Sequence, residues 1–204
     1  VARLCIAHNV LVLTDEVYEH LTYDGARHIP MATLPGMAER TFTLSSTGKT
    51  FSLTGWKIGW GYGPASMAAA AQAAHQFITF ATATPFQQAM VKALEAPDDF
   101  FAALQLEYLE RRDFLVRVLQ EVGFQVSIPQ GTYFVLADFS SFGFDDDLQF
   151  TRHLTTVVGV ACIPPSVFYK VAVDEGRRRV RFAFCKRLET LEAAAERLLK
   201  LRTG

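Results

Sequence analysis

Two charged residues that follow predicted β-strands have side chains able to carry chemistry. Asp15 comes just after an apolar run at residues 10–13 that is typical of a strand buried on both faces. Lys49 lies in the loop 45–51, after a second predicted strand at residues 41–45. A carboxylate at such a place must be paired or is costly to desolvate, and a partly desolvated amine near another cation becomes a usable nucleophile. Each residue also has a plainer interpretation, as a helix cap for the segment after Asp15 and as a solvated loop lysine.

The segment Gly48-Lys49-Thr50 ends like the phosphate loop of nucleoside triphosphatases, and residues 11–16 look like the acidic strand that accompanies it. That loop requires a glycine five residues before Gly48, where this chain has Thr43. The acidic strand also precedes the lysine loop, which reverses the expected order. Both departures disfavour a nucleoside triphosphatase.

The same residues fit the requirements of pyridoxal phosphate without any departure. This cofactor needs a lysine to form its Schiff base and a carboxylate to keep its ring nitrogen protonated. Its phosphate needs cationic and hydroxyl partners. Lys49, Asp15, Lys57 and Ser46 supply these types, and all four are predicted at strand ends or in the loops that follow them.

Strands and helices alternate along most of the chain, which predicts an α/β fold. Strands are expected at residues 10–13, 41–45, 57–62, 132–137, 160–163 and 180–184. Helices are expected at residues 1–8, 66–79, 85–94, 98–122, 147–157 and 188–201. We place a domain boundary near residue 95, between a first α/β domain (residues 1–95) and a smaller α+β domain (residues 96–204) entered through the long helix.

Composition excludes several classes of protein. The 204 residues carry 20 Lys and Arg against 21 Asp and Glu, and this near-zero balance is not that of a nucleic-acid-binding domain. No apolar run approaches the roughly 20 residues that span a bilayer. Three scattered cysteines predict buried free thiols, and five histidines show no metal-ligand spacing. We therefore expect a cytoplasmic protein without a metal, a nucleic-acid partner or a membrane partner.

A set of short motifs resembles the fold-type I, class I/II aminotransferases. The matching segments occur in the family's order and with family-like spacing, at residues 14–18, 46–52, 54–60, 129–134, 163–169 and 180–184. Details at residues 18–21, 164–166 and 184–187 are similar to the branch that contains the kynurenine–oxoglutarate and glutamine transaminases. Bacterial methionine and N-succinyldiaminopimelate aminotransferases are similar too. The resemblance implies an α/β fold in which part of a mostly parallel, three-layer large-domain sheet precedes a smaller α+β domain.

The resemblance implies a role at pyridoxal 5'-phosphate for several residues. Lys49 would form the internal aldimine and later move the proton between the substrate α-carbon and the cofactor. Asp15 would pair with the pyridinium nitrogen, Val17 would pack behind the ring, and Tyr18 would hydrogen-bond the phenolic oxygen.

Three further residues would bind charged groups of the cofactor and the substrate. Ser46 and Lys57 would hold the phosphate, with Lys57 at a position where many relatives carry arginine. Arg181 would clamp the substrate α-carboxylate.

The implied activity is ping-pong transamination between an amino acid and a 2-oxo acid, in a protein that is a homodimer when complete. The resemblance covers only the C-terminal half of the family pattern, so we expect the chain to be a fragment of a longer enzyme. Two alternatives use the same scaffold. One is a cysteine-conjugate carbon–sulfur β-lyase that employs the same lysine, and the other is a non-catalytic remnant.

Overall fold

The computed structural model describes residues 1–170 and 173–203. The strands are β1 (Val12–Asp15), β2 (Thr41–Ser46), β3 (Gly59–Tyr62), β4 (Gln125–Val126), β5 (Phe134–Asp138) and β6 (Arg179–Ala183). The α-helices are α1 (Ala2–Ala7), α2 (Thr47–Thr50), α3 (Ala65–Ile78), α4 (Thr84–Leu94), α5 (Asp98–Val122), α6 (Asp147–His153), α7 (Val173–Arg177) and α8 (Leu188–Leu198). The chain divides into two compact units, Val1–Leu104 and Gln105–Gly204, and the border falls inside α5.

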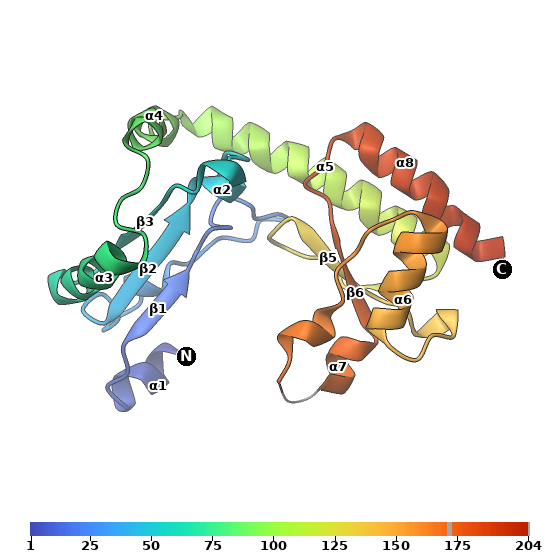
Figure 1. The fold of residues 1–204 in the computed structure, drawn as a ribbon, viewed down its shortest axis with the longest axis horizontal. Helices are drawn as coiled ribbons and strands as arrows, with labels where there is room; N and C mark the ends of the chain where they lie inside the picture. Colours follow the sequence, from blue (N-terminus) through green and yellow to red (C-terminus); the bar gives the residue numbers. More distant parts are fainter. Residues whose placement is uncertain (171–172, 204) are drawn as a thin grey trace. The chain divides into compact units, whose positions relative to one another are not determined.

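The first unit is built on a three-stranded sheet in the order β1-β2-β3 (Figure 1). Strand β1 is parallel to β2, with Asp15 opposite Leu44, and β3 is antiparallel to β2, with Ser46 opposite Gly59. The carboxyl ends of β1 and β2 therefore lie at the same edge of the sheet, where β3 begins. This edge is the one that the sequence predicted to carry chemistry.

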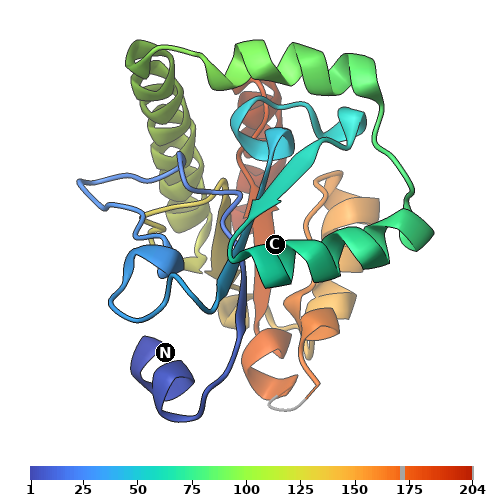
Figure 2. The same ribbon diagram turned by 90° about the vertical axis from the view of Figure 1, so that its left-hand side faces the viewer.

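Close approach between β3 and β2 requires glycine in β3. A Cβ atom on Gly61 would lie 2.5 Å from a ring carbon of Phe42 and 2.9 Å from Leu44 Cδ2. Helix α3, none of whose residues is buried, lies beside this sheet (Figure 2). Its residues Ala68, Ala71, Gln72 and His75 line a pocket together with the strands.

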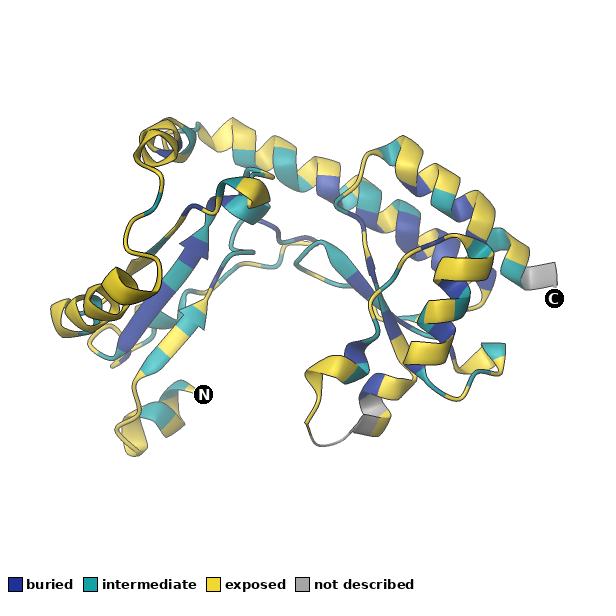
Figure 3. Cartoon of the chain, in the orientation of Figure 1, coloured by how far each residue is buried: buried dark blue, intermediate teal, exposed yellow. Residues whose placement is uncertain are grey.

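The expectation that the first strand is buried on both faces is wrong. Strand β1 begins at Val12, and the side chain of Leu13 is 67% exposed on one face of the sheet. Strand β2, at the centre, is the buried one, with Thr41 and Thr43 fully inaccessible (Figure 3). An apolar run indicates that a strand can be buried, but its neighbours in space decide whether it is.

The second unit packs helices on an antiparallel sheet in the order β4-β5-β6. The predicted period of the long helix α5 is confirmed, since its residues Tyr108, Leu115 and Leu119 are buried. The helix ends at Gly123, whose φ of +114° is left-handed, as a helix stop requires. The buried rings of Phe139 and Phe150 stack 4.4 Å apart in the same core.

Two predicted elements of the second unit differ from the structure. The strand expected at residues 160–163 is wrong, because the segment makes a single bridge in which Ile163 and Arg181 exchange backbone hydrogen bonds of 2.9 and 3.0 Å. The helix expected at residues 147–157 is divided into α6 and a π-helical turn, Leu154–Val158, which ends at Gly159.

The three cysteines are free, but each is partly exposed, contrary to the expected burial. No helix in the described part of the chain is both long and apolar enough to span a bilayer.

Candidate functional site

The turn that carries Lys49 follows directly from the end of β2. Ser46 has extended backbone and caps α2, with its hydroxyl oxygen accepting the amide hydrogen of Gly48 at 3.4 Å. The buried Thr47 hydroxyl donates to the carbonyl of Ile58 at 3.1 Å and so ties this turn to the segment before β3. Lys49 lies in the last turn of α2, where the helix dipole favours a cation.

Lys49 meets Tyr18, which comes from the other parallel strand. The Lys49 ammonium nitrogen lies 5.8 Å from the centroid of the Tyr18 ring, within the range of a cation–π contact. Tyr18 follows β1 and Lys49 follows β2, so the parallel register of these two strands brings them together. The contact joins two residues that the sequence assigned to one site.

Two neighbouring pockets are lined by the other predicted site residues of this unit. A pocket of about 370 Å³ is lined by Ser46, Lys49 and Lys57. A pocket of about 540 Å³ is lined by Asp15, Val17 and Ser46. Both pockets include Ser46 and Gly59, so they meet where β2 ends and β3 begins. The predicted site residues thus bring one carboxylate, two ammonium groups and one hydroxyl to this edge of the sheet.

Asp15 is exposed in the structure and shapes the turn after β1. Its Oδ1 accepts the amide hydrogen of Val17 at 3.3 Å. No helix begins at Glu16, so the interpretation of Asp15 as a helix cap is wrong. The contact is a local turn of the kind that aspartate stabilises, and it leaves the second carboxylate oxygen available to a ligand.

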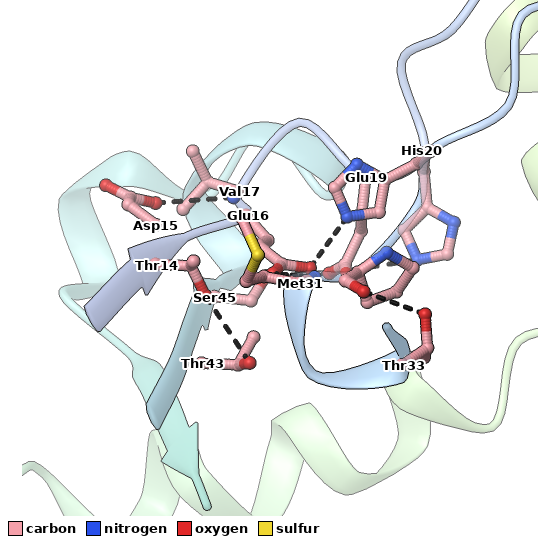
Figure 4. A network of polar contacts seen from close by, with 12 residues as sticks. Thr14, Asp15, Glu16, Val17, Glu19, His20, Met31, Thr33, Thr43 and Ser45 are labelled. Atoms are coloured by element: carbon pink, nitrogen blue, oxygen red, sulfur yellow. Dashed lines mark hydrogen bonds and ion pairs between the residues drawn. The ribbon is translucent and has the colours of Figure 1, made fainter. Parts of the chain in front are cut away.

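Sequence reasoning missed a buried network behind this turn. The Glu16 carboxylate is only 7% exposed, and it accepts hydrogen bonds from His28 Nε2 at 2.7 Å and from the Met31 amide at 3.1 Å (Figure 4). Burial raises the pKa of Glu16, but the hydrogen bonds from His28 and Met31 outweigh it and hold the pKa below its ordinary value. The sequence does show an acidic residue, Glu16, next to Asp15. Its partners His28 and Met31 lie in an irregular loop, so no sequence pattern pointed to them.

Two further contacts fix the same loop. The Ser45 hydroxyl donates to the Glu19 carboxylate at 2.7 Å, which ties the loop to β2. The His20 ring stacks on Phe101 with centroids 4.3 Å apart, and burial lowers its pKa in spite of the nearby Glu19. Together with the Glu16 network, which precedes Tyr18, these two contacts hold the loop on both sides of that residue.

Lys57 lines the pocket and has an unusual backbone conformation. It has φ +56° and ψ +39°, which is left-handed, and it ends a 3₁₀ turn, Thr54–Trp56. Stacking of Trp56 on Phe86, with centroids 4.5 Å apart, anchors that turn. Lys57 thus lies before β3, which begins at Gly59, and not within the third strand as the sequence predicted. Left-handed non-glycine residues are uncommon and recur at functional sites.

Arg181 belongs to the second unit and lies in the middle of β6, opposite Leu136 of β5. Its guanidinium carbon is 4.9 Å from the centroid of the Phe134 ring and 5.4 Å from that of Phe168. The guanidinium therefore has an aromatic contact from β5 and a second one from the turn that contains Phe168. Aromatic faces restrain a guanidinium without using its hydrogen-bond donors.

Comparison with known proteins identifies the family. A family model described as aminotransferase class I and II matches residues 1–198. The chain belongs to the class I and II aminotransferases. Their cofactor is pyridoxal 5'-phosphate.

The chain is similar to several curated aminotransferases. It is 46% identical over 205 residues to the "Probable N-succinyldiaminopimelate aminotransferase DapC" of Mycobacterium tuberculosis, covering 97% of this chain and 52% of that protein. It is 43% identical to the kynurenine–oxoglutarate transaminase of Dictyostelium discoideum, covering 95% of this chain and 49% of that protein. It is 40% identical to the methionine aminotransferase of Escherichia coli, covering 95% and 50% respectively. The chain therefore spans about half the length of the curated relatives it matches.

Solved structures give the same result for the fold. The structure of N-succinyldiaminopimelate aminotransferase from M. tuberculosis matches with a TM-score of 0.94 at 48% identity, covering 98% of this chain and 52% of that one. The aromatic aminotransferase from Pyrococcus horikoshii matches with a TM-score of 0.90 at 30% identity, covering 99% and 53%.

The described residues hold no cluster of His, Cys, Asp or Glu arranged to bind a metal ion.

Proposed function

We propose that the chain is the lysine-bearing part of a pyridoxal phosphate-dependent aminotransferase that moves an amino group from an amino acid to a 2-oxo acid in a ping-pong cycle. The observation that carries this proposal is the gathering of Lys49, Lys57 and Ser46 around one small pocket beside Asp15. Family membership supports the same activity.

The residues at the sheet edge fit the cofactor. Two ammonium groups and a hydroxyl match the charge and hydrogen-bonding needs of a phosphate monoester, and an exposed carboxylate on the shared edge matches a protonated ring nitrogen. In this proposal Ser46 and Lys57 bind the phosphate and Asp15 pairs with the ring nitrogen. Val17 packs on the ring and Tyr18 hydrogen-bonds its phenolic oxygen. The cofactor, when bound, supplies an electron sink for the carbanion formed at the substrate α-carbon.

Lys49 and Arg181 act on the substrate. The Lys49 amine would hold the cofactor, and it would take the proton from the substrate α-carbon as a general base. The Arg181 guanidinium binds the substrate α-carboxylate through two parallel hydrogen bonds. Lys49 thus moves the proton, and Arg181 orients the α-carbon for that transfer.

The family also suggests how the chain is organised in a complete enzyme. We propose that residues 1–95 are the C-terminal part of a large cofactor-binding domain and that residues 96–204 form the small domain. The sheet β1-β2-β3 would then be part of a larger, mostly parallel sheet in a three-layer fold. The complete enzyme would be a cytoplasmic homodimer. The names of the relatives point to amino donors such as N-succinyldiaminopimelate, kynurenine and methionine.

The proposal is tested by amino-group transfer to the cofactor. The chain is loaded with pyridoxal phosphate and mixed with methionine or kynurenine, and the formation of pyridoxamine phosphate and the matching 2-oxo acid is followed by chromatography. We expect equal amounts of both products, and we expect Lys49→Ala to remove the reaction. A rate in the parent chain that does not exceed that of Lys49→Ala contradicts the activity for this chain. Release of ammonia and pyruvate from a cysteine conjugate without pyridoxamine phosphate would indicate the β-lyase instead.

A further inference from the structure

The second unit contains a buried carboxylate whose burial is not explained by the packing of the core. Asp147, the first residue of α6, is fully inaccessible to solvent. One carboxylate oxygen, Oδ2, accepts the amide hydrogen of Ser166 at 2.8 Å, and the other has no hydrogen-bond partner among the described residues. Burial of a carboxylate with an unpaired oxygen is costly, so another property of the protein must favour aspartate at this position.

Helix capping does not require Asp147. The preceding residue, Asp146, already caps α6, because its Oδ1 accepts the amide hydrogen of Gln149 at 2.8 Å. Within the described residues, the hydrogen bond of the Asp147 side chain leads out of the helix, to a segment nineteen residues later. The role of Asp147 therefore lies in what that segment does.

The segment bonded to Asp147 is the 3₁₀ turn Pro165–Phe168. Its last residue, Phe168, is 67% exposed, so burial in the core does not hold this ring in place. The ring nevertheless lies 5.4 Å from the guanidinium carbon of Arg181. The backbone of the turn must supply the restraint that the ring lacks.

The turn is held from two sides. Asp147 bonds its backbone from α6, and α7 packs against it at Gly176. A Cβ atom on Gly176 would lie 3.0 Å from Ser166 Cα and 3.0 Å from Tyr169 Cδ2, so the two segments are in close contact. A turn restrained in this way presents the Phe168 ring in one place.

We propose that Asp147 is a positioning residue for Arg181. Its hydrogen bond with the Ser166 amide holds the Pro165–Phe168 turn, and the turn keeps the Phe168 ring against the guanidinium, which also contacts the Phe134 ring. A guanidinium restrained by two rings loses less rotational freedom when it binds a carboxylate. This inference rests on the proposed function, in which Arg181 binds the α-carboxylate of the substrate.

The catalytic consequence is a change in substrate binding alone. If the Arg181 side chain is no longer held in place before substrate binds, it must be ordered on binding. The cost of ordering one side chain corresponds to about a two- to tenfold rise in KM. The rise applies to every α-carboxylate substrate, and kcat is unchanged because Asp147 does not touch the reacting atoms.

The linkage can be measured in the 204-residue chain without cofactor or substrate. The probe is the Nε–Hε signal of Arg181 in a ¹⁵N–¹H NMR spectrum, assigned by its disappearance in Arg181→Lys. Ring currents from the two phenylalanines shift this signal upfield. We compare Asp147→Ala, which removes the acceptor, with Asp147→Asn, which keeps an oxygen that can accept the Ser166 amide hydrogen. Asp146→Ala is the matched control, because it removes the cap of the same helix and leaves the Ser166 contact.

We expect Asp147→Ala to lose part of the upfield shift, Asp147→Asn to restore most of it, and Asp146→Ala to keep it. An unchanged Arg181 signal in a folded Asp147→Ala chain overturns the proposal, as does an equal loss in Asp146→Ala. If Asp147→Ala does not fold, Phe168→Leu decides, because it removes the exposed ring that the turn presents and leaves the contact between Asp147 and Ser166 in place. This variant must lose part of the upfield shift of Arg181, and an unchanged signal overturns the proposal. Failure of the transfer reaction at Lys49 would leave these signals unaffected, so the two proposals can fail separately.

Discussion

The ammonium group of Lys49 lies 5.8 Å from the centroid of the Tyr18 ring. The two residues belong to different turns, one after β1 and one after β2, and the parallel pairing of these strands brings the turns to the same edge. Because the pairing also places Asp15 and Ser46 at that edge, a single structural feature assembles most of the site.

Replacement of Tyr18 tests this contact. Tyr18→Leu removes the ring face, and we expect it to lower the free energy of unfolding by about 0.5–1 kcal/mol, the usual size of an exposed cation–π contact. Tyr18→Phe keeps the ring and serves as the matched control. Urea unfolding at neutral pH measures both variants, and equal stabilities would show that the ring does not contact Lys49.

The buried Glu16 predicts a dependence of stability on pH. The fold holds the pKa of Glu16 below its ordinary value, so the contribution of this carboxylate to stability is complete above the ordinary pKa and is lost as the pH falls through the lowered pKa. We therefore expect the stability difference between the parent chain and Glu16→Gln to narrow as the pH falls from about 7 to about 3. Urea midpoints across this range measure it, with the exposed Glu39→Gln as control. A difference that widens on acidification would contradict the depressed pKa.

The close packing of β3 on β2 predicts an asymmetric effect of alanine at two glycines. Gly61→Ala places a methyl group 2.5 Å from the Phe42 ring, and such overpacking costs about 1–3 kcal/mol. Gly55→Ala meets nothing within 4 Å and is the control. Thermal unfolding of both variants tests the prediction, which fails if Gly61→Ala is as stable as Gly55→Ala.

The position of Lys57 beside the pocket of Ser46 and Lys49 predicts that this lysine binds the cofactor phosphate. Lys57→Ala removes a charged donor worth about 1.5–3 kcal/mol, so pyridoxal phosphate should bind about ten- to a hundredfold more weakly. Lys57→Arg keeps the charge and adds the two-pronged geometry, and we expect it to bind at least as tightly as the parent. Equilibrium titration of the cofactor measures all three, and the exposed Lys92→Ala is the control. Unchanged affinity in Lys57→Ala would exclude Lys57 from the site.

Sequence patterns predicted the elements whose signals are local. The acidic start, the apolar period and the final glycine predicted α5 to within a residue, and the strand ends near Asp15 and Ser46 were also predicted. The segment of Lys49, expected to be a loop, is the short helix α2. The short apolar segment at residues 160–163 misled because such runs do not distinguish a strand from other buried backbone.

Contacts between distant residues were beyond the reach of the sequence. The hydrogen bond between His28 and Glu16 closes an irregular loop that has no period to detect. The bond from Ser166 to Asp147 depends on how a turn and a helix pack, which neither segment encodes alone. The exposure of Leu13 depends on which elements cover the face of the sheet, which the apolar run does not state.

The measurement that tests the central claim most directly is reductive trapping at Lys49. The chain is incubated with pyridoxal phosphate, reduced with borohydride, digested and mapped by mass spectrometry, beside Lys49→Ala. We predict a phosphopyridoxyl adduct on Lys49 that forms at far lower cofactor concentration than adducts on the exposed Lys92 or Lys186. An adduct distributed evenly over the lysines, or one equally abundant in Lys49→Ala, would contradict the assignment of Lys49 as the residue that holds the cofactor.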